Sequence, residues 1–385
     1  MIILLFKFHK HIFLYITLFL LLGTNISMGQ QLKKKNIQID PALIVETSQK
    51  KNKKRAECKK GISTKDNPLA VFYELSLSID NGWGSCERCF KEPISIAIDS
   101  NENIYVLDSG SSNNRIQKFN KYGDFVKLWG EKGTTIGKFD NPQGLAIDVN
   151  NDNVLYVVDT DNDRVQVFDT DGNCKKKSRD EYIVWGSRGS SASSFQKPTK
   201  ICIDKNNSIY LLDVGNHRIQ KFNSDGDFLT EWGMYGSSEG EFSELVSIAY
   251  NSIKFGDTIY ILDKIKIDKE EFRLQAFDKN GKFLKRIYFQ LSKELEKKFV
   301  NPIDFTFDNE GNIFVLDQKS SKIFKFRGDD EIENEKHIIR YITSWGEKGQ
   351  DKNQLQEPAA IIAYEDDIFV VDKGNHRIQK FSEVY

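Results

Sequence analysis

The sequence contains few of the residues that build disulfide scaffolds and metal sites. Its 385 residues include five cysteines and five histidines. Five cysteines are too few for a disulfide scaffold in a chain of this length, and the odd number leaves at least one without a partner in the chain. Cys86-Glu-Arg-Cys89 has the spacing of a redox pair, half a metal site or a small disulfide, but no second such pair completes four zinc ligands. We expect a structural disulfide or an unused pair.

The leading segment lacks a hydrophobic run long enough to cross a bilayer. The apolar run Ile12–Leu22 is shorter than the roughly 20 residues that a spanning helix needs. It follows the basic residues Lys7 and Lys10 and precedes the small-x-small triplet Ser27-Met28-Gly29, an order typical of a secretory signal peptide. We therefore expect residues 1–29 to be a cleaved signal peptide and the protein to be secreted, extracellular or periplasmic. An uncleaved membrane anchor is the alternative.

Charge is divided unevenly along the chain. The net charge is −1, yet residues 31–66 hold eleven Lys or Arg against four Asp or Glu. Since the leader adds two more basic residues, residues 67–385 carry a net charge of −10. The Lys-rich segment 30–68 has too little apolar surface to fold, which predicts a basic disordered tether. The acidic remainder argues against nucleic acid as a partner, and membrane association is expected only through an uncleaved leader or the tether.

A repeated unit organises the remainder of the chain. The decapeptide Asp213–Phe222 recurs as Asp372–Phe381 with one difference in ten positions. Weaker copies end at Phe119, Phe168, Phe277 and Phe326, so the repeats are spaced by 49 to 55 residues. A period of about 50 residues that contains several short strands is typical of propellers or solenoids.

The third repeat shows how one unit is built. Residues 198–204, 209–213, 218–222 and 228–233 alternate as strands, and the turns between them are rich in Asn, Asp and Gly, which tolerate tight hairpins. Each repeat therefore predicts one four-stranded antiparallel blade. The second strands end in aspartate, and a large apolar residue precedes each first strand and is expected to pack the connection between blades; these residues are Phe90, Phe139, Phe195, Phe242, Phe299 and Leu355.

The two ends of the repeat region complement each other. Residues 71–84 contain the Trp83-Gly84 pair that marks a fourth strand but lack the three strands before it, whereas residues 358–382 supply those three strands only. We therefore predict an all-β, six-bladed propeller over residues 69–385, closed by pairing of the N-terminal strand with the C-terminal blade. The fourth repeat departs most, with an enlarged turn from Asp263 to Arg273 and a short helix expected from Phe289 to Lys298.

The combination of Pro-x-x-Ile-x-Ile-Asp, Asn-His-Arg-Ile-Gln-Lys-Phe and Trp-Gly resembles the NHL repeat, from about residue 71 to the C-terminus. The resemblance implies a six-bladed NHL propeller. NHL propellers include peptide-amidating lyases, RNA-binding tripartite-motif proteins and extracellular sensor or adhesion modules, so the resemblance alone leaves the function open.

Amidating lyases of this architecture hold a metal with histidines, some directly after the proline that starts an inner strand. The corresponding residues here are Ile94, Gln143, Thr199, Val246, Ile303 and Ala359. His217 and His376 occupy the same turn in repeats on opposite sides of the ring, too far apart to share a zinc ion. We expect no catalytic residues, no bound metal and no cofactor, with a lyase or hydrolase that has a degenerate site, amidating-lyase-like or lactonase-like, as the alternative.

The sequence therefore favours an exported, non-enzymatic, monomeric propeller that acts as a binding scaffold for a protein, peptide or glycan. We expect its ligand face to carry the turns between second and third strands. The candidate residues are Asn114, Asn162, Asn216, His217, Lys264, Lys266, Asn375 and His376. The aspartate and arginine that flank these turns, such as Asp213 and Arg218, are expected to pair locally at about 0 to 1 kcal/mol if exposed.

Overall fold

The computed structural model describes residues 72–384, except 81, 83, 85, 111, 112, 254, 255 and 268. These residues belong to one compact unit, Pro68–Val384. The predicted signal peptide (1–29), the predicted tether (30–68) and Trp83 lie outside the described residues. Within the described part of the chain, no helix is both long enough and apolar enough to cross a bilayer.

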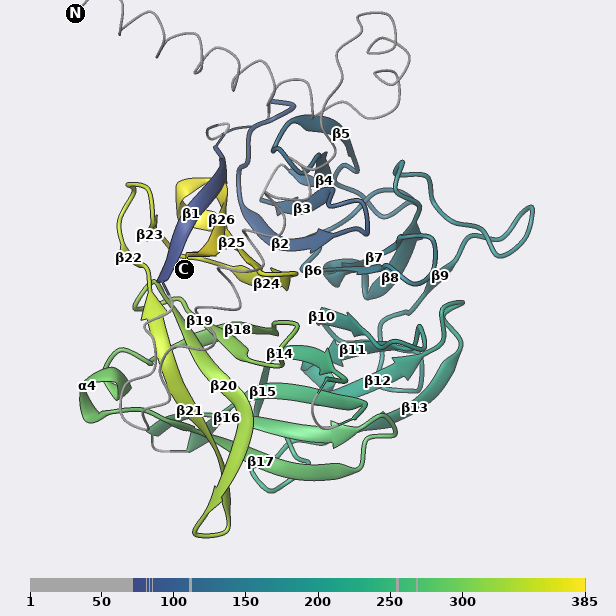
Figure 1. The fold of residues 1–385 in the computed structure, drawn as a ribbon. Coiled ribbons are helices and arrows are strands. Elements are labelled where there is room, and N and C mark those ends of the chain that lie inside the picture. The colour runs from purple at the N-terminus through teal and green to yellow at the C-terminus, as the bar shows by residue number, and fades with distance from the viewer. Residues whose placement is uncertain are drawn as a thin grey trace, which may run out of the picture. The chain divides into compact units, whose positions relative to one another are not determined.

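The described residues are almost entirely β-strand, and the strands follow the sequence repeats (Figure 1). The first repeat forms β2 (Pro93–Ile98), β3 (Ile104–Ser109), β4 (Asn114–Phe119) and β5 (Phe125–Trp129). The second forms β6 (Gly144–Asp148), β7 (Val154–Asp159), β8 (Arg164–Phe168) and β9 (Val184–Trp185). The third forms β10 (Pro198–Ile203), β11 (Ile209–Asp213), β12 (Arg218–Phe222) and β13 (Phe228–Trp232).

The later repeats contain longer strands. The fourth forms β14 (Glu244–Asn251), β15 (Thr258–Ile267), β16 (Lys269–Asp278) and β17 (Phe283–Gln290), and the fifth forms β18 (Pro302–Phe307), β19 (Ile313–Asp317), β20 (Lys322–Glu333) and β21 (Lys336–Trp345). The last forms β24 (Ala360–Tyr364), β25 (Asp367–Asp372) and β26 (Arg377–Val384). The short elements are β22 (Glu347–Lys348), β23 (Gln354–Leu355), α4 (Lys293–Glu296) and the 3-10 turns η1 (Thr160–Asn162), η2 (Val214–Asn216) and η3 (Lys373–Asn375).

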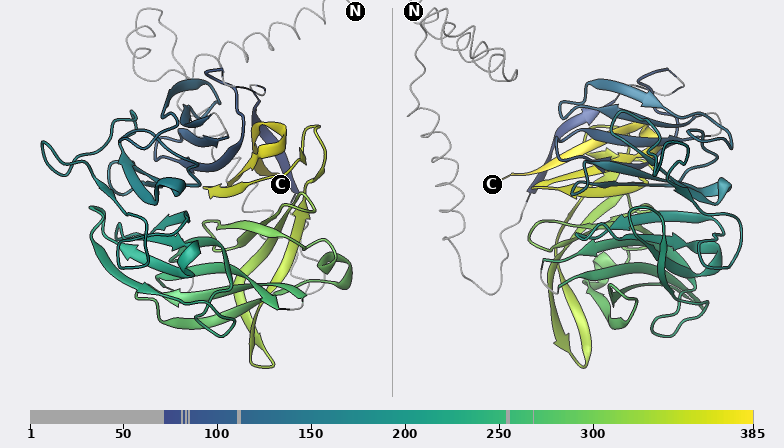
Figure 2. Two further views of the ribbon diagram at one scale, coloured as in Figure 1. Left: turned by 180° about the vertical axis from the view of Figure 1, so that it is seen from behind. Right: turned by 90° about the vertical axis from the view of Figure 1, so that its right-hand side faces the viewer.

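The sheets are arranged around a common centre as the blades of a β-propeller, which confirms the predicted all-β propeller fold (Figures 1 and 2). Each repeat pairs its strands in sequence order with the first strand innermost. Each first strand contacts the first strand of the next repeat, and β24 contacts β2. Because an inner strand has a partner on one side only, its other edge faces the centre of the ring.

The N-terminal strand β1 (Phe72–Ile79) joins the sheet of the last repeat. It runs antiparallel to β26, with Phe72 opposite Val384 and Ile79 opposite Ile378. This is the segment to which the sequence assigns the role of fourth strand. Tyr73 of β1 also stacks on Trp345 of the preceding repeat, with ring centroids 4.2 Å apart, so β1 contacts two neighbouring repeats.

Buried apolar clusters fill the space between consecutive sheets. One cluster joins Leu107 and Ile116 of the first repeat to Leu155 and Phe168 of the second. The residues predicted to pack the connections are fully buried, apart from the half-buried Phe299. In the second, third and fourth repeats, the tight turn before the fourth strand lies against the preceding repeat: a Cβ on Gly226, whose φ is +82°, would come within 2.4 Å of the Trp185 ring.

Three features differ from the sequence prediction. The enlarged turn of the fourth repeat is a continuation of the β15–β16 hairpin, which stays paired from Lys264 opposite Phe272 out to Ile267 opposite Lys269. The fifth repeat has a second extended hairpin, β20–β21, whose β21 also pairs in parallel with β17 and merges two repeats into one sheet of eight strands. The predicted helix within 289–298 is limited to α4, because β17 continues to Gln290.

Candidate functional site

A buried polar node fixes the turn between the second and third strands of each repeat. In the third repeat, the carboxylate of Asp213 is fully buried and accepts hydrogen bonds from the backbone N–H of Gln196 (2.7 Å) and the side chains of Asn216 (2.8 Å), Arg218 (2.9 Å) and Gln220 (3.1 Å). Four donors therefore contact one carboxylate, one at Oδ1 and three at Oδ2.

The arginine of the node holds the connection that enters the repeat. Arg218 donates to the backbone carbonyls of Ser191 (2.8 Å) and Ser194 (2.9 Å), and Gln220 donates to the second of these (2.8 Å). Equivalent Asp–Arg–Gln sets are Asp108, Arg115 and Gln117; Asp159, Arg164 and Gln166; Asp263, Arg273 and Gln275; Asp372, Arg377 and Gln379. The pair was expected to act within one turn, but it links two segments of the chain.

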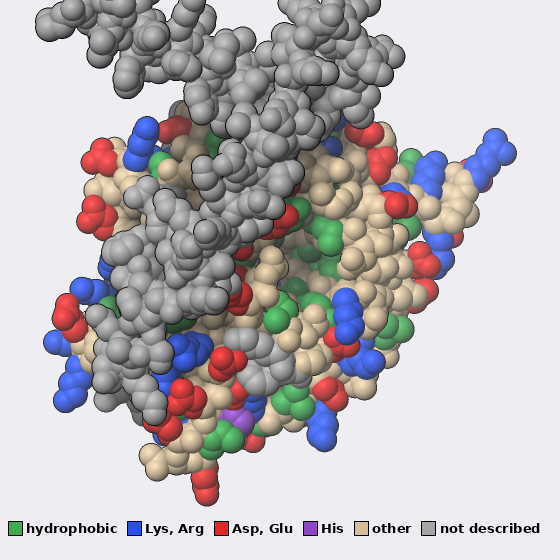
Figure 3. Space-filling model, in the orientation of Figure 1, with side chains coloured by type: hydrophobic (Ala, Val, Ile, Leu, Met, Phe, Trp, Pro, Cys, Tyr) green, Lys and Arg blue, Asp and Glu red, His purple; other side chains and the backbone are tan. Residues whose placement is uncertain are grey.

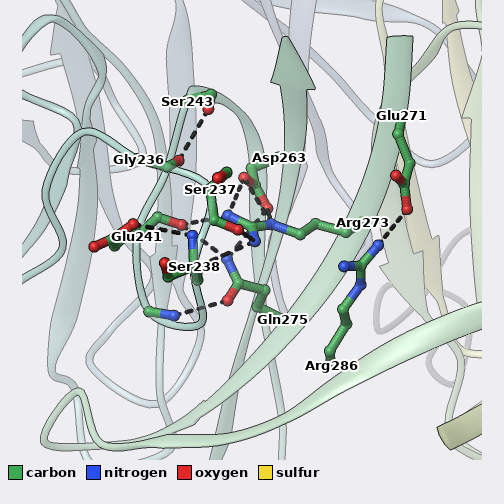
Figure 4. A network of polar contacts seen from close by, with 11 residues as sticks. Gly236, Ser237, Ser238, Glu241, Ser243, Asp263, Glu271, Arg273, Gln275 and Arg286 are labelled. Atoms are coloured by element: carbon green, nitrogen blue, oxygen red, sulfur yellow. Dashed lines mark hydrogen bonds and ion pairs between the residues drawn. The ribbon is translucent and has the colours of Figure 1, made fainter. Parts of the chain in front are cut away.

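Figure 4 shows this node in the fourth repeat. The guanidinium of Arg273 lies between the carboxylate of Asp263 and the backbone carbonyls of Ser237, Ser238 and Glu241. Burial raises the pKa of Asp263, and the hydrogen bond and charge of Arg273 oppose that rise. The described part of the fifth repeat differs, since Lys322 donates to the carbonyl of Gly346 (2.7 Å) in place of an arginine.

The predicted asparagines lie in or beside these nodes. Asn162, Asn216 and Asn375 each donate to the node aspartate and to a backbone carbonyl of the incoming connection, at 2.8 to 2.9 Å. Asn114 is buried in β4 and accepts from the backbone N–H of Asn141 (3.0 Å). In the first repeat the equivalent donor is Asn113, one position earlier, which bonds to Asp108 (2.9 Å). These amides are engaged within the fold.

The predicted histidines end the same turns. His217 and His376 both have a φ of 54°, the left-handed conformation that closes η2 and η3. The Nδ1 atom of His376 lies 2.8 Å from the carbonyl oxygen of Lys91, and the ring of His217 packs edge-on against Tyr235 at 5.0 Å. Each histidine therefore has a neighbour of its own, and the structure does not bring the two together.

The predicted lysines belong to the β15–β16 hairpin. Lys264 lies one residue beyond the node aspartate Asp263, and its ammonium is 5.5 Å from the centre of the Phe272 ring. The backbone of Lys266 pairs with Glu270, whereas its side chain lies outside the part of the structure that is described.

A cavity of about 580 Å³ lies beside the base of this hairpin. The rings of Phe272, Tyr288, Phe289 and Phe299 contribute to its lining, together with an ion pair between Arg286 and Glu271 (Figure 4). The guanidinium of Arg286 lies 4.7 Å from the centre of the Tyr288 ring. Sequence reasoning missed this cavity, although Tyr288 in place of the Trp-Gly tryptophan marked the region as different.

The cysteine pair is a disulfide, which agrees with one of the expected alternatives. Cys86 and Cys89 are bonded, with their Cα atoms 5.1 Å apart. Their two carbonyls accept from Arg115, so the disulfide lies in the connection that the node of the first repeat holds. Over the described residues, no group of three or more His, Cys, Asp or Glu side chains has a metal-binding arrangement.

The sheet arrangement and the repeated node define the class of the protein, a β-propeller built from short sequence repeats. The family model described as NHL repeat matches residues 90–119, 139–168 and 195–222. Human NHL repeat-containing protein 3 is 30% identical over 152 residues, which are 37% of this chain and 42% of the human protein. The chain therefore contains NHL repeats, as the sequence resemblance implied.

Other relatives share smaller parts or the fold alone. Mouse peptidyl-glycine alpha-amidating monooxygenase is 33% identical over 112 residues, which are 28% of this chain and 11% of the mouse protein. The solved structure of virginiamycin B lyase from Staphylococcus aureus aligns with a TM-score of 0.51 and 13% identity, covering 81% of this chain and all of that chain. At this identity the structural likeness establishes the propeller fold. The alignments to the human and mouse proteins cover less than half of either relative.

Proposed function

We propose that this chain is an exported, non-catalytic binding scaffold, and that a peptide segment of a partner protein binds beside the β15–β16 hairpin. The observation that carries the proposal is the cavity of about 580 Å³ at the base of the hairpin. Binding pockets of this size are typically lined by aromatic and apolar side chains with a few polar groups that orient the ligand.

The lining supports a peptide as the ligand. The aromatic rings of Phe272 and Phe299 offer apolar contact area, and aromatic side chains contribute much of the energy of peptide and protein interfaces. Arg286 and Glu271 form an ion pair at the surface of the cavity, which provides both donors and acceptors for a peptide backbone. The hairpin above the cavity adds further surface that other described second-to-third-strand turns lack.

The test uses a shortened hairpin that retains the node. Residues 264–272 are replaced by Val-Gly-Asn-His, the four residues that join Asp213 to Arg218 in the third repeat. The node residues Asp263 and Arg273 then stay in place, so the ring is expected to fold, with unchanged circular dichroism and cooperative unfolding. A second variant, Arg286→Met, alters the cavity and leaves the hairpin intact.

Partners are captured by crosslinking from the extracellular or periplasmic fraction of the source cells, with the wild-type protein and both variants in parallel. The proposal expects a defined partner that the wild type retains and both variants lose. The proposal would be refuted if the folded hairpin variant retained the same partner. It would also be refuted if a free glycan, and not a peptide digest of the partner, competed with the partner for binding.

A further inference from the structure

A second cavity lies on the axis of the ring, away from the β15–β16 hairpin. It has a volume of about 350 Å³, and the first strands of all the repeats surround it. Aliphatic side chains of these strands dominate its wall, while Tyr250 and Tyr364 lie at the strand ends that lead into the first-to-second-strand turns. In the view of Figure 3 the surface is hollowed near the centre of the ring, and hydrophobic side chains lie along the uncovered side of the hollow.

One charged cluster interrupts this apolar wall. The ammonium of Lys200 lies 3.1 Å from Oδ2 of Asp304, and Oγ of Ser247 lies 2.5 Å from Oδ1 of the same carboxylate. The three residues come from β10, β18 and β14, so the cluster exists only because the repeats meet on the axis. Both charged side chains are largely removed from solvent, with 20% of Lys200 and 9% of Asp304 exposed.

The hydrogen-bonding capacity of the cluster is unequal. Asp304 accepts from Lys200, from Ser247 and from the backbone N–H of Ile361 (3.1 Å). A lysine ammonium has three donors, and among the described residues the ammonium of Lys200 donates to Asp304. The cluster therefore offers donors to a ligand in the cavity, and few free acceptors.

Charge determines which acceptor fits. Lys200 and Asp304 already neutralise each other, so a carboxylate or ammonium ligand would add an uncompensated charge inside an apolar cavity, at a high desolvation cost. An uncharged carbonyl oxygen can accept from the ammonium without that cost. We propose that the axial cavity binds a small, uncharged, mainly aliphatic molecule whose carbonyl oxygen accepts a hydrogen bond from Lys200.

Cyclohexanone is a suitable probe because it is uncharged, compact and carries one carbonyl. Methylcyclohexane, which lacks the acceptor, and cyclohexanecarboxylate, which is charged, are its matched controls. We expect saturable binding of cyclohexanone by calorimetry, at least about tenfold tighter than that of methylcyclohexane, since a hydrogen bond to a charged group contributes about that much or more. The carboxylate is expected to bind more weakly than cyclohexanone.

Two further measurements locate the ligand and separate binding from folding. Cys202 lines the cavity and is a free cysteine, so bound cyclohexanone is expected to slow its alkylation. In the double variant Lys200→Met with Asp304→Leu the cavity stays apolar and no charge is left unpaired, so the ring is expected to fold while the preference for cyclohexanone over methylcyclohexane falls to about one. Absence of saturable binding, an unchanged preference in the double variant, or tighter binding of the carboxylate would each overturn the proposal.

Discussion

The node of the third repeat predicts a large and local dependence of stability on Arg218. Replacing Arg218 with Ala leaves the carboxylate of Asp213 fully buried, with three remaining donors and no neighbouring guanidinium. The same change removes the only arginine contacts to the carbonyls of Ser191 and Ser194 that the described residues provide. Removal of one partner of a buried ion pair costs about 3 to 5 kcal/mol, because the other charge stays in a poorly solvated place.

A surface ion pair of the same protein gives the matched control. Lys121 and Glu102 are 2.9 Å apart, and 43% and 45% of their side chains are exposed. An exposed pair contributes about 0 to 1 kcal/mol, so Lys121→Ala is expected to have little effect. The two variants therefore separate the buried geometry from the mere presence of an ion pair.

The assay is urea unfolding at pH 7, followed by circular dichroism and tryptophan fluorescence, with the free energy of unfolding taken from each curve. We expect Arg218→Ala to lose about 3 to 5 kcal/mol and Lys121→Ala less than about 1 kcal/mol. Equal losses for the two variants would contradict the reasoning, because they would show that solvent screens the node. A loss below about 1 kcal/mol in Arg218→Ala alone would do the same.

Two other predictions concern packing and pH. Gly226→Ala is expected to lower the free energy of unfolding by about 1 to 3 kcal/mol more than Gly240→Ala. Both glycines have positive φ, but only at Gly226 would a Cβ meet the Trp185 ring. Thermal or urea unfolding of the two variants measures the difference. Burial alone would raise the pKa of Asp330. The hydrogen bonds and charges of Lys285 and His337 have a larger effect in the opposite direction and hold that pKa below its ordinary value. The stabilisation is therefore present above about pH 4 and lost as pH falls through the lowered pKa, so the stability difference between wild type and Asp330→Asn should shrink below about pH 4. A difference that is the same at pH 7 and pH 3 would contradict this assignment.

The repeat pattern predicted the strands well because the same physical constraint recurs in every repeat. Proline or a substitute at the start of a first strand, and aspartate at the end of a second strand, mark positions where the backbone must turn or where a carboxylate must accept several donors. Phe195 and its counterparts must fill the same space between sheets, so periodicity alone located them.

The extension of the β15–β16 hairpin does have a signal in the sequence. Ile265 and Ile267 alternate with Lys264 and Lys266, which is the period of a strand rather than of a loop. The alternation predicts continued pairing beyond Asp263, as observed. In contrast, the cavity beside the hairpin depends on how residues 289–300 pack against β16 and β17, and no periodic pattern encodes that packing.

The burial of the Asp–Arg pairs could not be read from the sequence for a different reason. The sequence places Asp213 and Arg218 on either side of one turn, which is compatible with an exposed pair. Their burial arises from the backbone of residues 186–197, whose carbonyls complete the coordination of the guanidinium. Every residue has a backbone carbonyl, so these partners leave no mark in the sequence. The spacing of Asp213 and Arg218 therefore predicts that they pair, but not that the pair is buried.

The axial cluster illustrates where a repeat protein can place polar side chains that the repeat pattern does not specify. The residues two positions after the proline or leucine that opens each first strand in the sequence are Ser95, Gly144, Lys200, Ser247, Asp304 and Ala360. Positions between sheets must fit a neighbouring sheet, so they repeat the same apolar residues. Side chains at this position, among them Lys200, Ser247 and Asp304, line the axial cavity rather than the space between sheets, so they need not repeat the same apolar residue. Lys200 and Asp304 are 104 residues apart in the chain, and only the ring geometry brings them together. Ligand-specific groups should therefore be sought at axial positions whose residue departs from the repeat pattern.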